Sequence, residues 1–541
     1  MSALGVLLGL RLRRDRVQLA LWIIGTAALA LFATVSLADT FGSADERRTL
    51  LALAIATPAV LVFRGTPNGA GLDEVTFFAI FAFLALLAGL MSTFLAVRHT
   101  RGDEEQGRAE MVSATSAGRM TPVLATLVHG IGANAVLGAA VAVAFVAGGL
   151  DATGSGVAGA AVAACGVAFL AFGLFAAQVL RTSRGANGLS IAFVVGAYVL
   201  RGLGDAAGTA SPDLLSVTPA WPSRLSPIGW AQRTGAWNQN DLMPLLLDLV
   251  FAAVLVAVVL ALQSVRDTGA SLLAPRAGRA TAPAALSGSF GLAWRLTRAG
   301  VLAWAVGAFV AGVLATTLTT LVGRIGEQAP EVAATLGRLS QAGSTLEQAL
   351  VATIFSLVGM LAAACAIQVM IRARQEETSG TAELLLGSSP VGRLRWAATY
   401  VGAGAVGIAI VLLAAFLGAV LGAAGGGETS AAIGDAAQAA VGQVPVALVF
   451  LGVALVVFVL LPALTVPLTW SLLGLATILG IFGGLIGLPE WIVDLSPFAN
   501  SPVPVGDSVD WTGGVWMLVI AAAAITGGTV IASRRELRTG G

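Results

Sequence analysis

Long apolar runs recur along the whole sequence and restrict its structural class more than any other feature. Each is about 20 residues long, the length that a helix needs to cross the roughly 30 Å hydrocarbon core of a bilayer. Hydrophobic residues make up 57% of the 541 residues and charged residues 11%, whereas soluble domains have about 25% charged residues. The sequence therefore predicts an all-α polytopic membrane protein.

The apolar runs form two sets of six predicted membrane spans. The first set covers 17–38, 75–97, 121–149, 156–180, 186–203 and 243–265. The second set covers 299–322, 350–371, 394–422, 441–461, 468–488 and 515–533. Each set follows a segment, 1–16 or 287–298, whose arginines and leucines are typical of an amphipathic helix at the membrane surface. We expect two transmembrane halves, 1–279 and 280–541.

Two longer segments, 204–242 and 489–514, precede the last span of each half. They contain Ser226-Pro227 and Ser496-Pro497. Their glycines, prolines and tryptophans lie beside apolar residues, which favours short interfacial or re-entrant helices packed within the protein. A plain surface loop is the alternative.

A charged loop follows the second span of each half. The first charged loop covers 98–119 and the second 372–395, and a shift of 273 residues aligns them. This shift places Arg101, Glu104, Gly107 and Glu110 on Arg374, Glu377, Gly380 and Glu383. Because each half has an even number of spans, both halves keep the same orientation, and the sequence predicts two parallel six-helix repeats.

The arginines are concentrated on one predicted side of the membrane. The two termini, the two charged loops and the segments 181–184 and 266–298 hold 22 of the 30 arginines and 10 of the 29 acidic residues. Arginine-rich loops stay in the cytoplasm. We therefore expect a multi-pass protein of the cell membrane, with both termini and both charged loops on the cytoplasmic side.

Several kinds of chemistry are excluded by missing residues. The only histidines are His99 and His129, and no His-Glu-x-x-His helix occurs, so a zinc protease lacks ligands and we expect no metal site. We interpret His129 as a helix-packing residue that hydrogen-bonds a neighbour; a ligand or proton-relay role is the alternative. The chain has no lysine and therefore no Walker phosphate-binding loop. Its energy must come from another chain or from an ion gradient.

The charged loops allow two interpretations. A solvated connection explains their arginines through the positive-inside rule alone. Docking to a soluble partner also explains the accompanying acids, the repeated Gly-x-x-Glu spacing, and the apolar residues that follow, Met111-Val112 and Leu384-Leu385-Leu386. A short amphipathic helix with a charged rim and apolar knobs fits a groove on a partner, and we favour docking.

In their order, these features resemble the permeases of ABC-2 type exporters. The similarity rests on the surface helix, the Gly-x-x-Glu-[Leu/Met] loop after the second span, and Ser-Pro-x-x-Trp before the sixth. The duplicated chain is similar to actinobacterial permeases for polyketide antibiotics (tetronasin-type) or multiple drugs, over essentially its whole length. The second half departs from the pattern, because no Trp follows its Ser496-Pro497-Phe498, so the two halves need not be equivalent.

The resemblance implies a type V ABC exporter fold. In that family, the loop after the second span carries a coupling helix that sits in a cleft of an ATPase subunit. The implied ATPase contacts are Glu104, Glu105, Gly107, Glu110, Glu376, Glu377, Gly380 and Glu383. Two copies of a separate ATPase would bind ATP and Mg, and this transport subunit would bind no cofactor and hydrolyse no ATP.

The predicted spans contain almost no charged residues, which limits the kinds of substrate that could pass between them. Arg201, Asp248 and Arg395 are expected near span ends, where charged groups reach the interface. Ion-coupled carriers bury ionisable residues in mid-span, so we favour an exporter. A twelve-span secondary drug carrier stays open as the alternative, and the lack of acid–base clusters disfavours a third class, a lipid-modifying enzyme.

The expected substrate is a hydrophobic or amphipathic compound, such as an antibiotic, a drug or a lipid-like molecule. A path without charges would leave a hydrated ion uncompensated, at a cost of about several kcal/mol. No nucleic acid is expected, and membrane lipids are the surrounding partner. Candidate polar contacts along the path, which serve equally well as helix-packing residues, are Asn134, Thr316, Thr317, Thr319 and Thr320.

Overall fold

The chain divides into two compact halves, Met1–Ala277 and Gly278–Gly541, where the sequence led us to expect a boundary after 279. The computed structural model describes residues 3–56, 58–265, 269–273, 280–281, 283, 288–328, 346–388, 391–424, 429–482, 489–502, 504–505 and 508–536. Among these residues, twelve helices are long and apolar enough to cross a membrane. This confirms the predicted all-α polytopic class.

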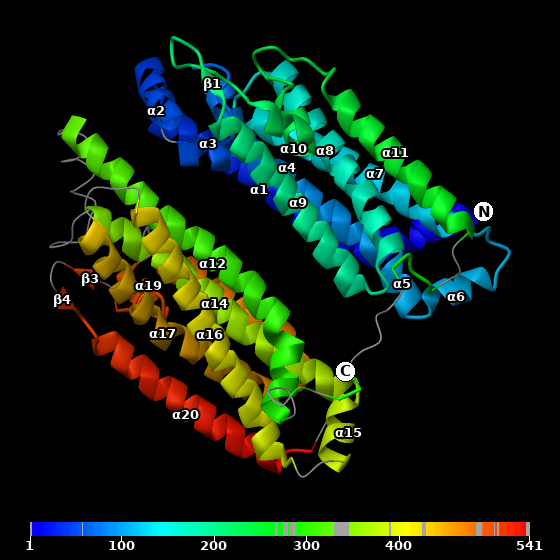
Figure 1. The fold of residues 1–541 in the computed structure, drawn as a ribbon, viewed down its shortest axis with the longest axis vertical. Coiled ribbons are helices and arrows are strands. Elements are labelled where there is room, and N and C mark those ends of the chain that lie inside the picture. The colour runs from blue at the N-terminus through cyan, green and yellow to red at the C-terminus, as the bar shows by residue number, and fades with distance from the viewer. Residues whose placement is uncertain are drawn as a thin grey trace. The chain divides into compact units, whose positions relative to one another are not determined.

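Helices dominate the first half (Figure 1). Its longer helices are α1 (Ala3–Thr40), α2 (Ala44–Ala56), α4 (Leu72–Arg98), α7 (Thr121–Ala147), α8 (Ala152–Val179), α9 (Ser183–Ala206) and α11 (Leu245–Val265). Its short elements are α3 (Pro58–Arg64), α5 (Arg101–Glu105), α6 (Arg108–Ser113), the hairpin β1 (Thr209–Ala210) and β2 (Val217–Thr218), η1 (Trp221–Leu225) and α10 (Pro227–Gln232). A capping box starts α2, and its hydrogen bonds from Ser43 lower the pKa of the Glu46 carboxyl.

The second half has the same kind of architecture. Its longer helices are α12 (Ser289–Gln328), α14 (Leu346–Thr378), α16 (Arg393–Ala423), α17 (Thr429–Leu460), α18 (Thr465–Thr477) and α20 (Thr512–Arg534). Its short elements are α15 (Thr381–Ser388), η3 (Pro462–Leu464), the π-helical turn η4 (Ile478–Phe482), α19 (Glu490–Val493), and the hairpin β3 (Pro504–Val505) and β4 (Ser508–Val509).

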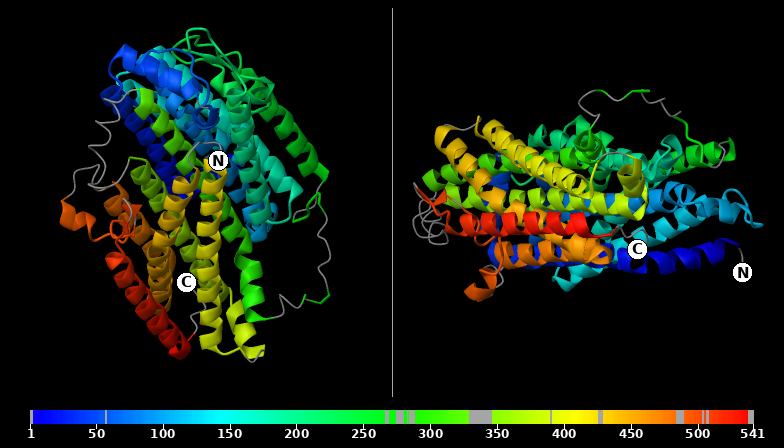
Figure 2. Two further views of the ribbon diagram at one scale, coloured as in Figure 1. Left: turned by 60° about the vertical axis from the view of Figure 1, so that its left-hand side comes forward. Right: turned by 90° about the horizontal axis from the view of Figure 1, so that it is seen from below.

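The two predicted surface helices are not separate elements. Residues 3–16 are the first turns of α1, which continues to Thr40, and the described part of 287–298 opens α12 in the same way. In the right-hand view of Figure 2, the first turns of α1 extend from the N-terminus as a regular helix. No Gly or Pro occurs between Leu10 and Ile24, so nothing in the sequence ends the helix near Arg16. Arg11 and Asp15 are buried rather than turned toward a membrane surface.

Helices α4 and α8 form the centre of the first half. Their fully buried side chains include Phe81, Leu84 and Phe169. Helix α7 packs against α8 at Gly138 and Gly159, where a Cβ atom on either glycine would lie 2.4 Å from the carbonyl oxygen of the other. Small residues at this crossing therefore allow the two backbones to touch, as is common between membrane helices.

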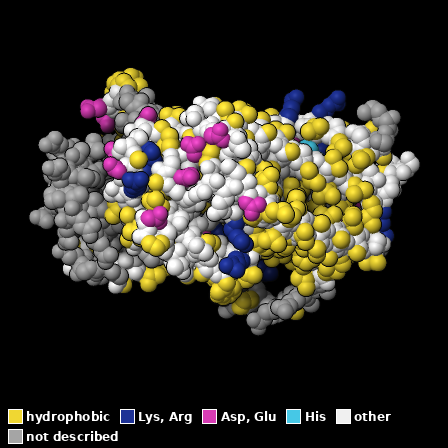
Figure 3. Space-filling model, turned by 90° about the horizontal axis from the view of Figure 1, so that it is seen from above, with side chains coloured by type: hydrophobic (Ala, Val, Ile, Leu, Met, Phe, Trp, Pro, Cys, Tyr) yellow, Lys and Arg dark blue, Asp and Glu magenta, His cyan; other side chains and the backbone are white. Residues whose placement is uncertain are grey.

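The core of the second half is built around α14 and α17. Phe355 on α14 and Phe458 on α17 are fully buried in it. Helix α20 lies at the edge of this bundle in Figure 1, and α11 lies at the edge of the first. Figure 3 shows hydrophobic side chains spread over a broad part of one face. Leu247, Val250 and Val254 on α11 are exposed hydrophobic residues, which suits contact with lipid.

The segments 204–242 and 489–514 contain short helices and two-residue strands. In the first, Ser226 Oγ donates to the carbonyl oxygen of Ala197 on α9 at 2.8 Å. In the second, Ser496 Oγ donates to the carbonyl oxygen of Ala476 on α18 at 2.7 Å. Both Ser-Pro motifs thus tie their segment to the fifth long apolar helix of their own half.

Candidate functional site

The first charged loop folds into two short helices joined by Gly107. Arg101 is buried, and its Nε and Nη2 atoms donate to the carbonyl oxygen of Ala177, near the end of α8, at 3.0 and 2.7 Å. Its Nη1 atom donates to Glu104 Oε2 at 2.6 Å. Glu104 therefore helps to fix α5 to the membrane helices, and it faces its own half.

The second charged loop repeats this internal pair with different surroundings. Glu377, at the end of α14, is fully buried. Its Oε2 atom lies 3.7 Å from Arg374 Nη1 and 2.5 Å from Arg535 Nη2. Glu376 accepts from Arg372 and from Thr381 Oγ1, at 2.5 and 2.6 Å. The C-terminal end of α20 is thereby joined to this loop.

Gly107 and Gly380 occupy the same place in the two loops and share an unusual backbone conformation. Their φ angles are 70° and 74°. These values lie in the left-handed region, which L-residues avoid and achiral glycine adopts readily. Each ends one helix turn and starts the next short helix, α6 or α15. The repeated glycine is required by the turn itself, whether or not a partner approaches its backbone.

Other residues of the motif point away from the core. Glu105 is exposed and accepts from the backbone N–H of Ser183 at 2.9 Å and from the Ser183 hydroxyl, which holds the loop against the start of α9. Glu110 and Glu383 are exposed on α6 and α15. The sequence could not separate these outward acids from Glu104 and Glu377, because all of them lie in one charged run.

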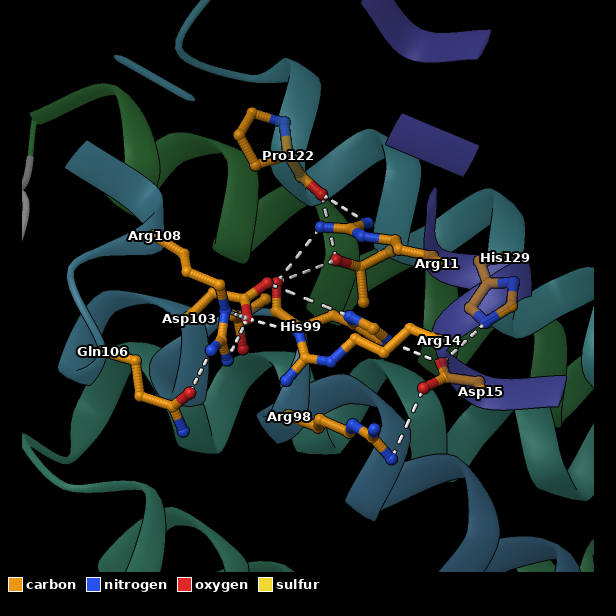
Figure 4. Close-up of polar contacts among 12 residues, drawn as sticks. Arg11, Arg14, Asp15, Arg98, His99, Asp103, Gln106, Arg108, Pro122 and His129 are labelled. Carbon is orange, nitrogen blue, oxygen red and sulfur yellow. Dashed lines mark hydrogen bonds and ion pairs between the residues drawn. The ribbon is translucent and has the colours of Figure 1, made fainter. Parts of the chain in front are cut away.

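Behind the first loop, a polar cluster joins three helices (Figure 4). His129 Nε2 on α7 lies 3.0 Å from Asp15 Oδ2 on α1, and His99 Nε2, next to the end of α4, contacts the same oxygen atom. His129 thus does hydrogen-bond a neighbouring helix. The sequence analysis did not identify Asp15. Its signal was that it is the only acidic residue among the arginines of residues 1–16, in a chain with only two histidines that could pair with it.

Arginines surround this cluster and extend it to the loop. Arg11 donates to the carbonyl oxygens of Pro122 and His99 at 2.9 and 3.2 Å. Arg14 Nη1 lies 2.8 Å from Asp103 Oδ1. Residues at the start of α1 therefore contact both the residue that follows α4, His99, and α5 itself at Asp103.

The described candidate path residues form hydrogen bonds within or between the helices of their own half. Asn134 is fully buried; its Nδ2 donates to Ser92 Oγ and to the Gly130 carbonyl oxygen, both at 2.9 Å. Thr316 Oγ1 donates to Ala419 O of α16 at 2.8 Å, and Thr317 Oγ1 to Val313 O at 2.8 Å. Thr319 and Thr320 belong to α12, and their side chains lie outside the described residues.

Two charged side chains expected at the interface are buried instead. Arg201 is inaccessible to solvent; it contacts Asp205 Oδ2 at 3.1 Å and donates to Val62 O at 2.8 Å. This pairing compensates the charge within the protein, because α9 continues to Ala206 and places Asp205 one turn after Arg201. Asp248 is also fully buried, and its carboxylate oxygens have no hydrogen-bond partner among the described residues.

Among the described residues, twelve apolar helices in two halves, each with a charged loop after its second span, define a multi-pass membrane protein. The family model described as "Multidrug efflux system permease Rv1217c, C-terminal domain" matches residues 4–262 and 286–531. The multidrug efflux system permease protein Rv1217c of Mycobacterium tuberculosis (strain ATCC 25618 / H37Rv) is 34% identical over 541 residues, covering 98% of this chain and 95% of that protein. The chain belongs to this family of multidrug efflux permeases, which confirms the resemblance inferred from the sequence.

Proposed function

We propose that the chain is the membrane subunit of an ATP-driven exporter, with two copies of a separate ATPase docked on its charged loops. One observation carries the docking proposal. Next to the exposed Glu110 and Glu383, Met111 and Leu384 are 65% and 72% exposed, and they are equivalent residues at the shift of 273. Each loop thus presents an acid and a large apolar side chain, a combination suited to a groove on a soluble protein.

The division of labour within each loop supports this proposal. Glu104 and Glu377 hold the loops to the membrane helices through buried or nearly buried ion pairs. A force applied by an ATPase at the exposed residues would therefore reach the helices through fixed contacts. We assign Glu110 and Glu383 to ATPase contact, Glu104 and Glu377 to transmission, Gly107 and Gly380 to the turn, and Glu105 and Glu376 to bracing of the loop.

The same contacts support a cytoplasmic location for both termini. Arg14 of α1 pairs with Asp103 of the first charged loop, and Arg535, after α20, pairs with Glu377 of the second. Each terminal segment therefore lies at the charged-loop end of its own half. We propose that this end faces the cytoplasm of the cell membrane, in line with its arginine content.

For the cargo, we propose hydrophobic or amphipathic drug-like compounds. The relative in Mycobacterium tuberculosis is named a multidrug efflux permease, and the buried Arg201 is already paired with Asp205 rather than open to an anion. Asn134, Thr316, Thr317, Thr319 and Thr320 remain proposed contacts. Since Asn134 and Thr316 hydrogen-bond within their own half, a cargo molecule would have to compete with those bonds.

The docking proposal is tested by reversing the outward charges. In a reconstituted complex, Glu110→Arg and Glu383→Arg should weaken ATPase binding by about 2–5 kcal/mol if these acids are desolvated in the interface, and Met111→Glu or Leu384→Glu should do the same. Arg13→Glu, which changes a charge outside the loops, is the control. Normal assembly and drug uptake by Glu110→Arg and Glu383→Arg together would show that the loops are solvated connections.

The energy source is tested separately. The purified chain should neither bind nor hydrolyse ATP until the partner ATPase is added. Drug uptake into vesicles should then require ATP and persist when the proton and sodium gradients are collapsed. Uptake that follows an ion gradient in the absence of any ATPase would establish the secondary carrier instead, an alternative that none of the observations above favours.

A further inference from the structure

Three side chains of metal-ligand type converge behind the first charged loop (Figure 4). They are Asp15 of α1, His99 next to the end of α4, and His129 of α7. Both histidine Nε2 atoms contact one carboxylate oxygen, Asp15 Oδ2, and that of His129 lies 3.0 Å away. One ligand atom from each residue lies within 4.8 Å of the others, and the three residues are at most 5% exposed.

The fold does not require this trio. The second half contains no histidine at all, although its α12, α14 and α16 correspond to α1, α4 and α7. Thr297 and Arg372 occupy the positions equivalent to Asp15 and His99, and a Gly-Ala pair at 402–403 matches the region of His129. Placing the only two imidazoles of the chain on one buried carboxylate therefore calls for an explanation specific to the first half.

The chemistry of the trio suits a particular class of ligand. Two imidazole nitrogens and one carboxylate oxygen are a common protein ligand set for Zn²⁺ and its neighbours in the first transition series. Arg98 Nη1 lies 3.4 Å from the other carboxylate oxygen, Oδ1, and this leaves Oδ2 directed at the two rings. Zinc sites with three protein ligands complete their shell with water.

The surroundings of His99 also fit a metal ligand. Coordination through Nε2 requires the ring proton to sit on Nδ1. His99 Nδ1 is buried without a hydrogen bond among the described residues, and it lies 3.9 Å from Asp103 Oδ2. Metal-bound histidines commonly donate this second N–H to a carboxylate. Asp103 is itself held by Arg14 and Arg108, each at 2.8 Å.

We propose that Asp15, His99 and His129 bind one divalent transition-metal ion of the zinc class. The ion would join α1 and α7 to the residue at which the first charged loop leaves α4. It would brace this loop alone, since the second half lacks all three ligands. The proposal concerns binding by the isolated chain and does not depend on ATPase docking or on the cargo.

The test uses the full-length chain with an affinity tag that contains no histidine. The protein is stripped with a chelator, incubated with Zn²⁺ and freed of unbound ion, and its zinc is counted by mass spectrometry. We expect one Zn²⁺ per chain. X-ray absorption of the zinc-loaded wild type should show imidazole ligands, and because His99 and His129 are the only histidines, this signal identifies the site without any variant.

Variants then assign the ligands. Asp15→Asn and His129→Gln should each abolish stoichiometric binding, and Asp103→Asn should weaken it by about 10–100-fold, as loss of a carboxylate behind a ligand does. The double variant Cys165→Ser, Cys365→Ser is the matched control and should keep full binding. Substoichiometric zinc in the wild type, a spectrum without imidazole, or equal zinc in His129→Gln would each overturn the proposal and leave a purely hydrogen-bonded trio.

Discussion

Glu377 Oε2 lies 2.5 Å from Arg535 Nη2, and this ion pair joins the second charged loop to the end of the last helix. In the first half, the equivalent acid, Glu104, pairs with Arg101, which instead holds the carbonyl oxygen of Ala177. Arg535 also donates to the carbonyl oxygen of Phe458 on α17 at 3.4 Å. The second loop is therefore anchored through α20 and α17, and the first through α8. Glu104 and Glu377, which are equivalent in sequence, each pair with an arginine of their own loop, but the loops contact different helices beyond that pair.

Glu377→Gln should destabilise the second half. The carboxylate is fully buried, and removing one partner of a buried ion pair costs about 3–5 kcal/mol, because the remaining charge is left uncompensated. Thermal unfolding in detergent would measure the loss. Glu383→Gln, on the exposed face of the same loop, is the control and should stay within about 0.5 kcal/mol of the wild type. Equal effects of the two substitutions would contradict an anchoring role for Glu377.

Gly107→Ala and Gly380→Ala should each cost about 1–2 kcal/mol, since a left-handed backbone is unfavourable for an L-residue. No heavy atom lies within 4 Å of a Cβ built at either position, so the cost comes from the backbone alone. Gly387→Ala is a matched control, because Gly387 lies in α15 with equally open space and no positive φ. There alanine should be neutral or stabilising. Thermal unfolding of the three variants measures these changes in stability. Equal shifts in all three would refute a cost that comes from the left-handed backbone.

Asp205→Asn and Asp248→Asn should have opposite consequences, although both carboxylates are fully buried. Asp205 neutralises Arg201 at 3.1 Å, and its loss should cost about 3 kcal/mol or more. Asp248 has no hydrogen-bond partner among the described residues, so an amide there removes a potential buried charge and loses no contact. We expect unchanged or higher stability for Asp248→Asn in the same unfolding assay. A large loss of stability would reveal a partner for Asp248 in the folded protein.

Gly166→Ala should disrupt the packing around Asn134. A Cβ atom at position 166 would lie 1.8 Å from Asn134 Oδ1, so the asparagine would have to leave its bonds to Ser92 and Gly130. The double variant with Asn134→Ala should recover part of the stability, with a coupling energy of about 0.5–3 kcal/mol. Additive losses would mean that Asn134 moves freely. If Asn134→Ala changes drug selectivity without lowering stability, the residue contacts cargo rather than packing the helices.

The sequence allowed the spans and the repeat to be predicted, because both depend on local properties. The length of an apolar run defines a membrane helix. The alignment of Gly107 with Gly380 can be read from the sequence whatever residues contact the two loops. The direction of each acid depends on tertiary contacts instead. Nothing in the order of residues separates Glu104, which pairs with Arg101, from Glu110, which is exposed.

The continuity of α1 was also beyond prediction from amphipathicity. Arginines beside leucines are typical of a helix on the membrane surface, but in the structure Arg11 and Asp15 are buried against the elements that follow α4. Asp248 shows the same limit: its position near the end of a span predicted access to the interface, and the packing of α11 against its neighbours prevents it.

The exposure of Glu110 and Glu383 has a practical consequence in a protein without lysine. Carbodiimide reagents condense carboxylates with amines, and no side chain here offers an amine. Apart from the amino terminus, this polypeptide cannot form such amide links with itself. Every amide bond that mass spectrometry finds between one of these two glutamates and a lysine side chain must therefore end on a different molecule, and that lysine identifies the neighbour directly.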